Sequence, residues 1–397
     1  MSDQADIAGA AVAKPPPWND PFIRSIFFQV VAVALLGYFF FFIFNNTLAN
    51  MEKSGVSTGF AFLNRQAGFG ILMSLIEYDE THTYGRTFFV GLLNTLLVAS
   101  VGIVFATILG FILGIARLSN NWIISKLAAG YIEIVRNIPL LLQILFWEFG
   151  VFLALPGPRE SLRFGDTFFL NNRGLFTPKP VFGDGFGIVT IAFVIAIVGI
   201  IFLRRWARQR QEKSGEQFPV FYTSLGLFIG LPLLAFLVMG MPLTWEFATL
   251  GRFSLSGGGN VIPEFMALLA ALAMYTAAFI GEIVRSGIQA VEHGQTEAAR
   301  ALGLRNGPTL RLVIIPQAMR VIIPPLTSQY LNLTKNSSLA TAIGYPELVS
   351  VFMGTTLNQT GQAVEIVAMT MAVYLTFSLS ISAIMNWYNK RVALVER

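Results

Sequence analysis

Residues 294–318 read GQTEAARALGLRNGPTLRLVIIPQA and connect two apolar stretches, 262–287 and the less hydrophobic 318–340. Each stretch is close to the 20 or so residues that a helix needs to cross the hydrocarbon core of a bilayer. The connecting segment is polar and contains glycine and proline, which end or interrupt helices. The sequence therefore predicts a compact loop between two late membrane spans.

Two short helical pieces are predicted within this loop, from Gln295 to Leu302 and from Pro308 to Ile315. Glycine and asparagine favour turns because they adopt backbone conformations that other residues resist. The residues expected to make turns between the two pieces are Gly303, Asn306 and Gly307. The first piece is slim and rich in alanine, with Leu302 and Leu304 as apolar anchors. Such a surface is suited to enter a groove on a partner protein.

The composition is that of an integral membrane protein. Of the 397 residues, 54% are hydrophobic and 12% are charged, and the mean hydropathy is +0.64. This charged share is about half of that in soluble proteins, and it excludes disorder and collagen. The absence of cysteine excludes a disulfide scaffold and a thiolate site. With only two histidines, far apart in the chain, no metal site is expected.

The hydropathy pattern predicts an all-α integral membrane fold with about eight transmembrane helices. The apolar stretches are 25–45, 88–116, 131–155, 186–203, 218–240, 262–287, 318–340 and 365–387. The second, third, sixth, seventh and eighth spans are expected to form a five-helix core. The first span and the pair within about 186–240 are expected to surround that core and to face lipid. Lys and Arg gather in the segments that this order places inside, which predicts that both termini are cytoplasmic.

Motifs for nucleotide hydrolysis or covalent catalysis are absent from the sequence. The chain has no G-x-x-x-x-G-K-[ST] phosphate-binding loop, no H-E-x-x-H and no G-x-S-x-G. We therefore do not expect the chain itself to be an enzyme.

The loop at 294–318 also carries a family pattern. Glu297-Ala298-Ala299, then Gly303, then Ile315-Pro316-Gln317-Ala318 resembles the EAA loop of ABC-transporter permeases. That family has the fold of a type I ABC importer, and the resemblance implies that this loop docks on a cytoplasmic ATPase. The residues to which it assigns ATPase coupling are Glu297, Ala298, Ala299, Leu302, Gly303 and Leu304.

Further motifs resemble the polar amino acid (histidine/glutamate) permeases. They are Asn94-Thr95-Leu96, Arg136-Asn137-Ile138-Pro139, Glu282-Ile283-Val284-Arg285 and Lys335-Asn336-Ser337-Ser338-Leu339. The additional N-terminal span and the insertion at about 186–240 are similar to the general L-amino acid (Aap/Bzt) subgroup. The corresponding division is a tail at 1–24, a first helix and outer loop at 25–87, a permease domain at 88–387 and a tail at 388–397.

The resemblance implies a permease subunit of an ATP-driven importer that moves L-amino acids across the inner membrane. It implies four kinds of partner: a homologous permease subunit, two P-loop ATPase subunits, a soluble substrate-binding protein and the amino acid itself. ATP and Mg would be bound by the ATPase, and no cofactor by this chain. No nucleic-acid partner is expected.

The seventh span supports transport independently of the family. Many polar groups between 327 and 338 would be prohibitive in contact with lipid, so they must face protein or a water-filled path. Pro324 and Pro325 precede them and permit a kink or an unwound turn. The residues expected to line the path are Gln329, Asn332, Lys335, Asn336, Ser337 and Ser338. Lys335 would bind the substrate carboxylate or pair with a carboxylate of a neighbouring helix.

Three charged residues near the inner surface are expected to serve in interfaces or salt bridges: Arg136, Glu282 and Arg285. Glu282 and Arg285 are three residues apart, which places them on one face of a helix. The alternative function is an ion-coupled secondary transporter or a channel. It would require intramembrane acidic residues, and these are scarce.

Overall fold

The computed structural model describes residues 20–53, 58–251 and 255–392. Twelve α-helices lie within these residues: α1 Pro21–Lys53, α2 Tyr84–Arg117, α3 Trp122–Asn137, α4 Leu140–Leu145, α5 Phe186–Ser214, α6 Val220–Val238, α7 Pro263–Gln289, α8 His293–Ala301, α9 Asn306–Thr309, α10 Ile315–Asn336, α11 Leu357–Thr360 and α12 Ala363–Val392. Shorter helical segments are η1 Phe60–Asn64, η2 Phe146–Phe152, η3 Pro158–Glu160, η4 Leu310–Ile314, η5 Ser337–Ile343 and η6 Val349–Thr356.

Seven described helices are long and apolar enough to span a membrane, or eight if one bent pair counts as a span. This confirms the all-α membrane fold. The first span is longer than expected, since α1 begins at Pro21, inside the predicted tail 1–24, whose residues 1–19 lie outside the described part. Likewise α12 continues to Val392, within the predicted tail 388–397.

The core forms around α7, which packs against α2, α3, α4 and α10. Small residues let these helices approach closely, the packing mode expected between membrane helices. Leu268, Leu272 and Ile280 of α7 are fully buried. At Gly110 of α2 a β-carbon would lie only 2.5 Å from the β-carbon of Ile280, so this crossing requires glycine.

The predicted third span, 131–155, is not one straight helix. The chain turns by 105° between α3 and the α4–η2 helix. Proline disfavours the helical conformation of the residue before it, and Ile138 accordingly has extended backbone angles (φ −95°, ψ 127°). Pro139 then caps the start of α4.

Short β-strands, which the sequence did not predict, form outside the helical core. They are β1 Leu162–Phe164, β2 Phe168–Asn171, β3 Gly174–Thr177, β4 Lys179–Phe182, β5 Leu243–Glu246, β6 Thr249–Leu250, β7 Leu255–Ser256 and β8 Gly259–Val261. A four-stranded antiparallel sheet has the order β1-β2-β3-β8. Two further antiparallel pairs, β4–β5 and β6–β7, are formed by strands that lie between β3 and β8 in the sequence. The pairing of β3 with β8 joins the two ends of the inserted α5–α6 hairpin.

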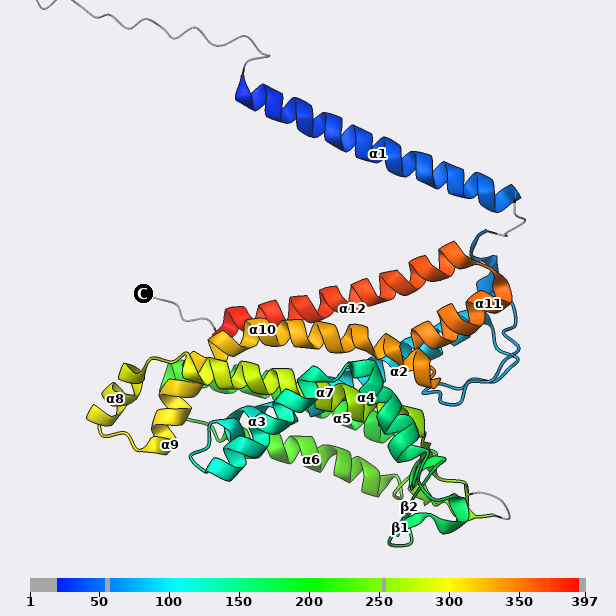
Figure 1. The fold of residues 1–397 in the computed structure, drawn as a ribbon. Coiled ribbons are helices and arrows are strands. Elements are labelled where there is room, and N and C mark those ends of the chain that lie inside the picture. Colours follow the sequence, from blue (N-terminus) through cyan, green and yellow to red (C-terminus); the bar gives the residue numbers. More distant parts are fainter. Residues whose placement is uncertain (1–19, 54–57, 252–254, 393–397) are drawn as a thin grey trace, which may run out of the picture.

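The loop helices and the strands lie at opposite ends of the bundle (Figure 1). In this view α8 and α9 are at the same end as the end of α12, while β1 and β2 are at the other end. Helix α1 lies apart from the bundle, and each of its described side chains is exposed from Pro21 to Thr47. The exposed apolar surface therefore includes α1 as well as much of α5 and α6.

Candidate functional site

The predicted coupling loop folds around a well-formed helix end. The amide of Gly303 donates to the carbonyl of Arg300 (2.9 Å), and that of Leu304 donates to Ala299 (3.1 Å). These two bonds define a Schellman motif, which needs a left-handed residue just beyond the helix. Gly303 supplies it, with φ +78°. Gly303 thus ends α8 directly after its alanine-rich segment, 298–301.

Helix α8 exposes most of the residues assigned to coupling. Ala299 is buried, whereas Glu297 and Ala298 are exposed and Leu302 is 82% exposed. Leu304 is half-buried beneath the turn. The end of α8 therefore presents the exposed apolar side chain of Leu302 on the same short helix as the exposed carboxylate of Glu297. We call this end the α8 tip.

Contacts within the loop hold α8 in place. The imidazole of His293 lies 3.0 Å from the carboxylate of Glu297, one turn along the helix. The side-chain amide of Gln317, in α10, donates to Gln295 in α8 (3.1 Å). This bond links α8 to the first turn of α10.

The second helical piece differs from the prediction. Asn306 and Gly307 do not form a turn; they begin α9, because the extended backbone of Arg305 (φ −71°, ψ 164°) caps that helix instead. Pro308 consequently falls in the first turn of α9, where a missing amide proton costs nothing. The chain then continues through η4 into α10.

Glu282 of α7 lies at the centre of a charged cluster. It accepts a hydrogen bond from Nε of Arg285 (3.0 Å) and also pairs with Arg117 of α2, which the sequence analysis did not single out. Among the described residues Arg136 has no carboxylate within ion-pair distance; its guanidinium lies over the ring of Phe279, 5.0 Å from the centroid. The cluster ties the ends of α2 and α7 together.

The polar residues of the seventh span lie in several environments. Helix α10 runs without a break through Pro324 and Pro325, so of the two irregularities that these prolines permit, the unwound turn does not occur. The helix tightens only at η5. Asn332 and Lys335 are exposed, Gln329, Asn336 and Ser338 are half-buried, and Ser337 is buried. The hydroxyl of Ser337 donates to the carbonyl of Thr334 (2.7 Å).

Two of the six predicted path residues, Lys335 and Ser338, line a cavity of about 510 Å³ between α10, η6 and α12. Its other walls are Val349, Met353, Thr370, Met371, Tyr374, Leu375 and Ser378. No ion pair joins Lys335 to a carboxylate of a described residue. The cavity thus combines one ammonium group with largely apolar walls, which suits a small ligand that has a carboxylate and a side chain. The hydroxyls of Ser338, Thr370 and Tyr374 already donate to other groups of the protein.

Glu347 is a buried carboxylate behind this cavity that sequence reasoning missed. It accepts hydrogen bonds from the amides of Val349 (2.9 Å) and Ser350 (2.7 Å) and from the hydroxyl of Tyr374 (2.9 Å). It lies between two membrane-spanning stretches, Asn306–Ile343 and Ala363–Arg391. Burial raises the pKa of Glu347 to about 7.

The segment that carries Glu347 is fastened to α2 by the Asn94-Thr95 pair. The side chain of Asn94 donates to the carbonyl of Pro346 (2.8 Å), and Thr95 accepts from the amide of Leu348 (3.0 Å). A β-carbon at Gly91 would lie 2.9 Å from the α-carbon of Leu348, so the two backbones are in close contact. Two polar residues inside the apolar second span were the sequence signal for this junction.

No group of three or more His, Asp or Glu side chains in the described part of the chain is placed to hold a metal ion. The described chain instead offers long helices, the cavity beside Lys335 and the exposed α8 loop. These features are suited to the binding of a small ligand or a partner and to movement of the helices.

Comparisons with known proteins agree with this arrangement. Residues 219–394 match the family described as binding-protein-dependent transport system inner membrane component. Over 95% of its length the chain is 56% identical to YhdX of Escherichia coli, a putative amino-acid ABC transporter permease, and covers 96% of it. It is 54% identical to the general L-amino acid transport system permease AapQ of Rhizobium johnstonii, covering 95% of this chain and 94% of the relative.

A third relative, the glutamate/glutamine/aspartate/asparagine transport permease BztB of Rhodobacter capsulatus, is 41% identical and aligns over 95% of this chain and 96% of its own. All three likenesses include the first helix, the inserted hairpin and the core. This chain therefore belongs to the family of amino-acid ABC transporter permeases.

Proposed function

We propose that this chain is the translocation subunit of an ATP-driven importer of L-amino acids in the inner membrane. The observation that carries this proposal is α8 itself: the Glu297-Ala298-Ala299 segment folds as a short helix that ends at Gly303, and it leaves Glu297, Ala298 and Leu302 exposed. Amino acids are proposed as the substrate class because the three relatives described above are named as permeases for amino acids.

A separate ATPase would bind the α8 tip and supply ATP hydrolysis with Mg, since this chain has no phosphate-binding loop. The ATPase-coupling residues are then Glu297, Ala298, Ala299, Leu302, Gly303 and Leu304. Movement of α8 would reach α10 through the Gln295–Gln317 bond and the short chain between the two helices. Helix α10 carries Lys335, so the same displacement reaches the cavity wall.

The cavity beside Lys335 would hold the amino acid during its passage. The ammonium of Lys335 is placed to bind the substrate carboxylate, and the apolar walls would contact the rest of the substrate. A state that opens this cavity inward and a state that opens it outward would alternate as the ATPase changes its preference between them.

The proposed orientation is supported by the arrangement of the two ends of the bundle. The α8 loop and the end of α12 lie at one end, which would be cytoplasmic together with both termini. The strands at the opposite end would face outward, where a soluble binding protein delivers substrate. The permease domain would be 88–387, with the inserted helices within about 186–240 and the coupling loop at 294–318. A homologous permease subunit would complete the path.

The test compares two exposed leucines on opposite sides of the membrane. Leu302→Glu changes the α8 tip, and Leu72→Glu changes a side chain that is 76% exposed in the outer loop. Both positions are too exposed for the charge to affect folding strongly. Co-purification in mild detergent from the native host should recover a P-loop ATPase with the wild type and with Leu72→Glu, but not with Leu302→Glu.

Two results would overturn the proposal. One is ATPase recovery with Leu302→Glu at the wild-type level. The other is a chain that purifies without any ATPase and moves amino acids in liposomes without ATP.

A further inference from the structure

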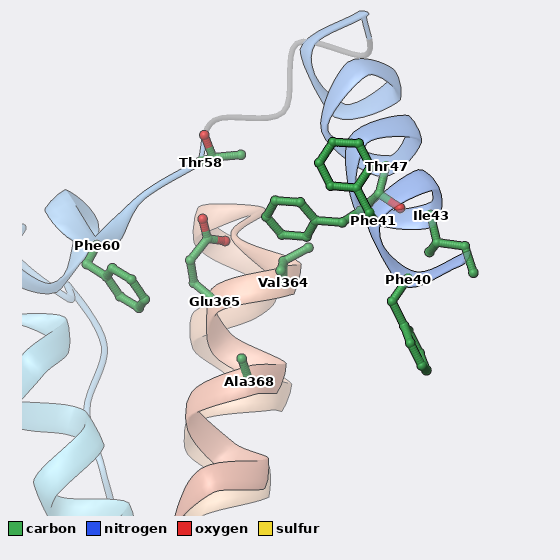
Figure 2. Close-up of a pocket in the computed structure, with 10 residues that line it drawn as sticks. Phe40, Phe41, Ile43, Thr47, Thr58, Phe60, Val364, Glu365 and Ala368 are labelled. Carbon is green, nitrogen blue, oxygen red and sulfur yellow. The ribbon is translucent and has the colours of Figure 1, made fainter. Parts of the chain in front are cut away.

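A slot of about 700 Å³ separates α1 from the first turns of α12. Its walls are apolar: Phe40, Phe41, Ile43 and Phe44 come from α1, and Val364 and Ala368 come from α12. Figure 2 shows the α1 side chains on one side of the slot and the α12 side chains on the other. The slot is lined by α1, α12 and residues 58–60, and no residue of α7 contributes to it.

The slot also contains one carboxylate that has an unsatisfied oxygen. Glu365 is only 8% exposed, and its Oε1 accepts a hydrogen bond from the amide of Gly59 (2.5 Å). Its Oε2 is buried and has no hydrogen-bond partner among the described residues. In Figure 2 the carboxylate lies at the top of the slot, near Thr58 and beside the apolar side chains. Burial of a carboxylate oxygen without a partner is costly, so the site favours a cationic ligand group.

The depth of this carboxylate specifies the ligand further. Glu365 is in the first turn of α12, and the α1 residues of the slot lie in the later half of their helix. In the proposed orientation both belong to the outer leaflet, where lipid headgroups meet hydrocarbon. A ligand that fits must carry a cation at headgroup depth and an apolar chain below it.

We propose that the slot binds a phospholipid whose headgroup carries a primary ammonium group. The ammonium would donate a hydrogen bond to Oε2 of Glu365, and an acyl chain would lie between the Phe40–Phe44 face and Ala368. Such a lipid would fill the space between α1 and α12 and would hold α1 beside the bundle. Anionic lipids would be excluded by the carboxylate.

The experiment uses the complete complex, purified in mild detergent and placed in nanodiscs of equal parts phosphatidylethanolamine and phosphatidylglycerol with identical chains. Native mass spectrometry, after the complex is released from the nanodiscs, measures which lipid stays bound to the protein. The wild type should retain phosphatidylethanolamine. Glu365→Gln, which keeps the acceptor for Gly59, should lower its occupancy roughly tenfold, as loss of a charge-assisted bond predicts.

Two further variants separate the headgroup from the chain. Ala368→Phe fills the slot without changing the carboxylate, and it should also reduce retention. Asp166→Asn removes an exposed carboxylate in the turn between β1 and β2 and should leave retention unchanged. Equal retention in wild type and Glu365→Gln, or equal retention of the two lipids by the wild type, would overturn the proposal.

The competing occupant is a side chain of another subunit. Because the chain has no cysteine, Ala368→Cys gives a single thiol in the slot. Reaction of this thiol with phosphatidylethanolamine that has a free amine and a thiol-reactive group on an acyl chain supports the lipid. Cross-linking of the thiol to a neighbouring subunit by a short thiol-to-amine reagent, with no reaction with the lipid probe, would contradict it.

Discussion

Lys335 brings a positive charge to a cavity whose other polar groups are mainly hydroxyls. Replacement by methionine keeps the length of the side chain but removes its charge. We expect Lys335→Met to raise the KM for amino acid uptake about tenfold or more, the value of a charge-assisted hydrogen bond. ATPase co-purification should be unchanged, because α8 is not altered.

Lys335→Arg retains the charge and should restore part of the affinity. Lys126→Met, at an exposed lysine of α3, serves as the control. An unchanged KM in Lys335→Met would remove this residue from the substrate path.

Glu347 should make stability depend on pH. Its pKa is raised from 4.5 to about 7 by burial, against hydrogen bonds that lower it. The folded protein therefore holds a proton that the unfolded chain has lost, and the stability gained from that proton disappears as pH rises through about 7. Between about pH 5 and about pH 8 the Tm of the wild type should fall relative to that of Glu347→Gln.

The control for this prediction is Glu77→Gln, at an exposed carboxylate of the outer loop. Its Tm should follow the wild type across the same range. Parallel Tm curves for wild type and Glu347→Gln would show that Glu347 does not titrate on unfolding.

At the scale of the element, the end of α8 depends on the left-handed backbone of Gly303. A β-carbon there meets nothing within 4 Å, so the cost of Gly303→Ala is conformational, about 1 kcal/mol. In Gly303→Ala we expect the end of α8 to fray. The ATPase should then bind more weakly, and the rate of ATP hydrolysis coupled to transport should fall. Gly307→Ala, equally open but without positive φ, should behave as wild type; equal loss in both variants would contradict the motif's role.

The contact of α2 with α7 requires glycine for a different reason. At Gly110 a β-carbon would lie 2.5 Å from Ile280 and 3.1 Å from the carbonyl of Ala277, so Gly110→Ala should destabilise by about 1–3 kcal/mol. Gly226 of α6 has nothing within 4 Å, and Gly226→Ala should stabilise by up to about 1 kcal/mol. Thermal unfolding in detergent measures both changes. A shift of the Tm in the same direction in Gly110→Ala and Gly226→Ala would contradict this packing.

The accuracy of sequence reasoning differed between elements. Apolar length and the helix-ending Gly303 are local signals, and they predicted the spans and the end of α8. The bend at Ile138 could also have been read, because Pro139 follows it. The pairing of β3 with β8 could not, because its two strands are only a few residues long and the whole α5–α6 insertion lies between them. Asn94 and Thr95 were noticed, but their partners lie some 250 residues away.

At the scale of the whole molecule, the described chain places an exposed loop at one end and a strand-bearing surface at the other. Between them the α10 helix connects α8 to the Lys335 cavity. An arrangement of this kind can transmit a change at the loop to the path without any chemistry in this chain. The central claim is therefore that transport is driven by an ATPase bound at α8.

The most direct test is amino acid uptake by the purified complex in proteoliposomes, with its binding protein on the side of the strands and ATP on the side of α8. We predict uptake that requires ATP, continues when ion gradients are abolished, and is lost in Leu302→Glu but not in Leu72→Glu. Uptake by this chain alone, without ATP and driven by an ion gradient, would contradict the account.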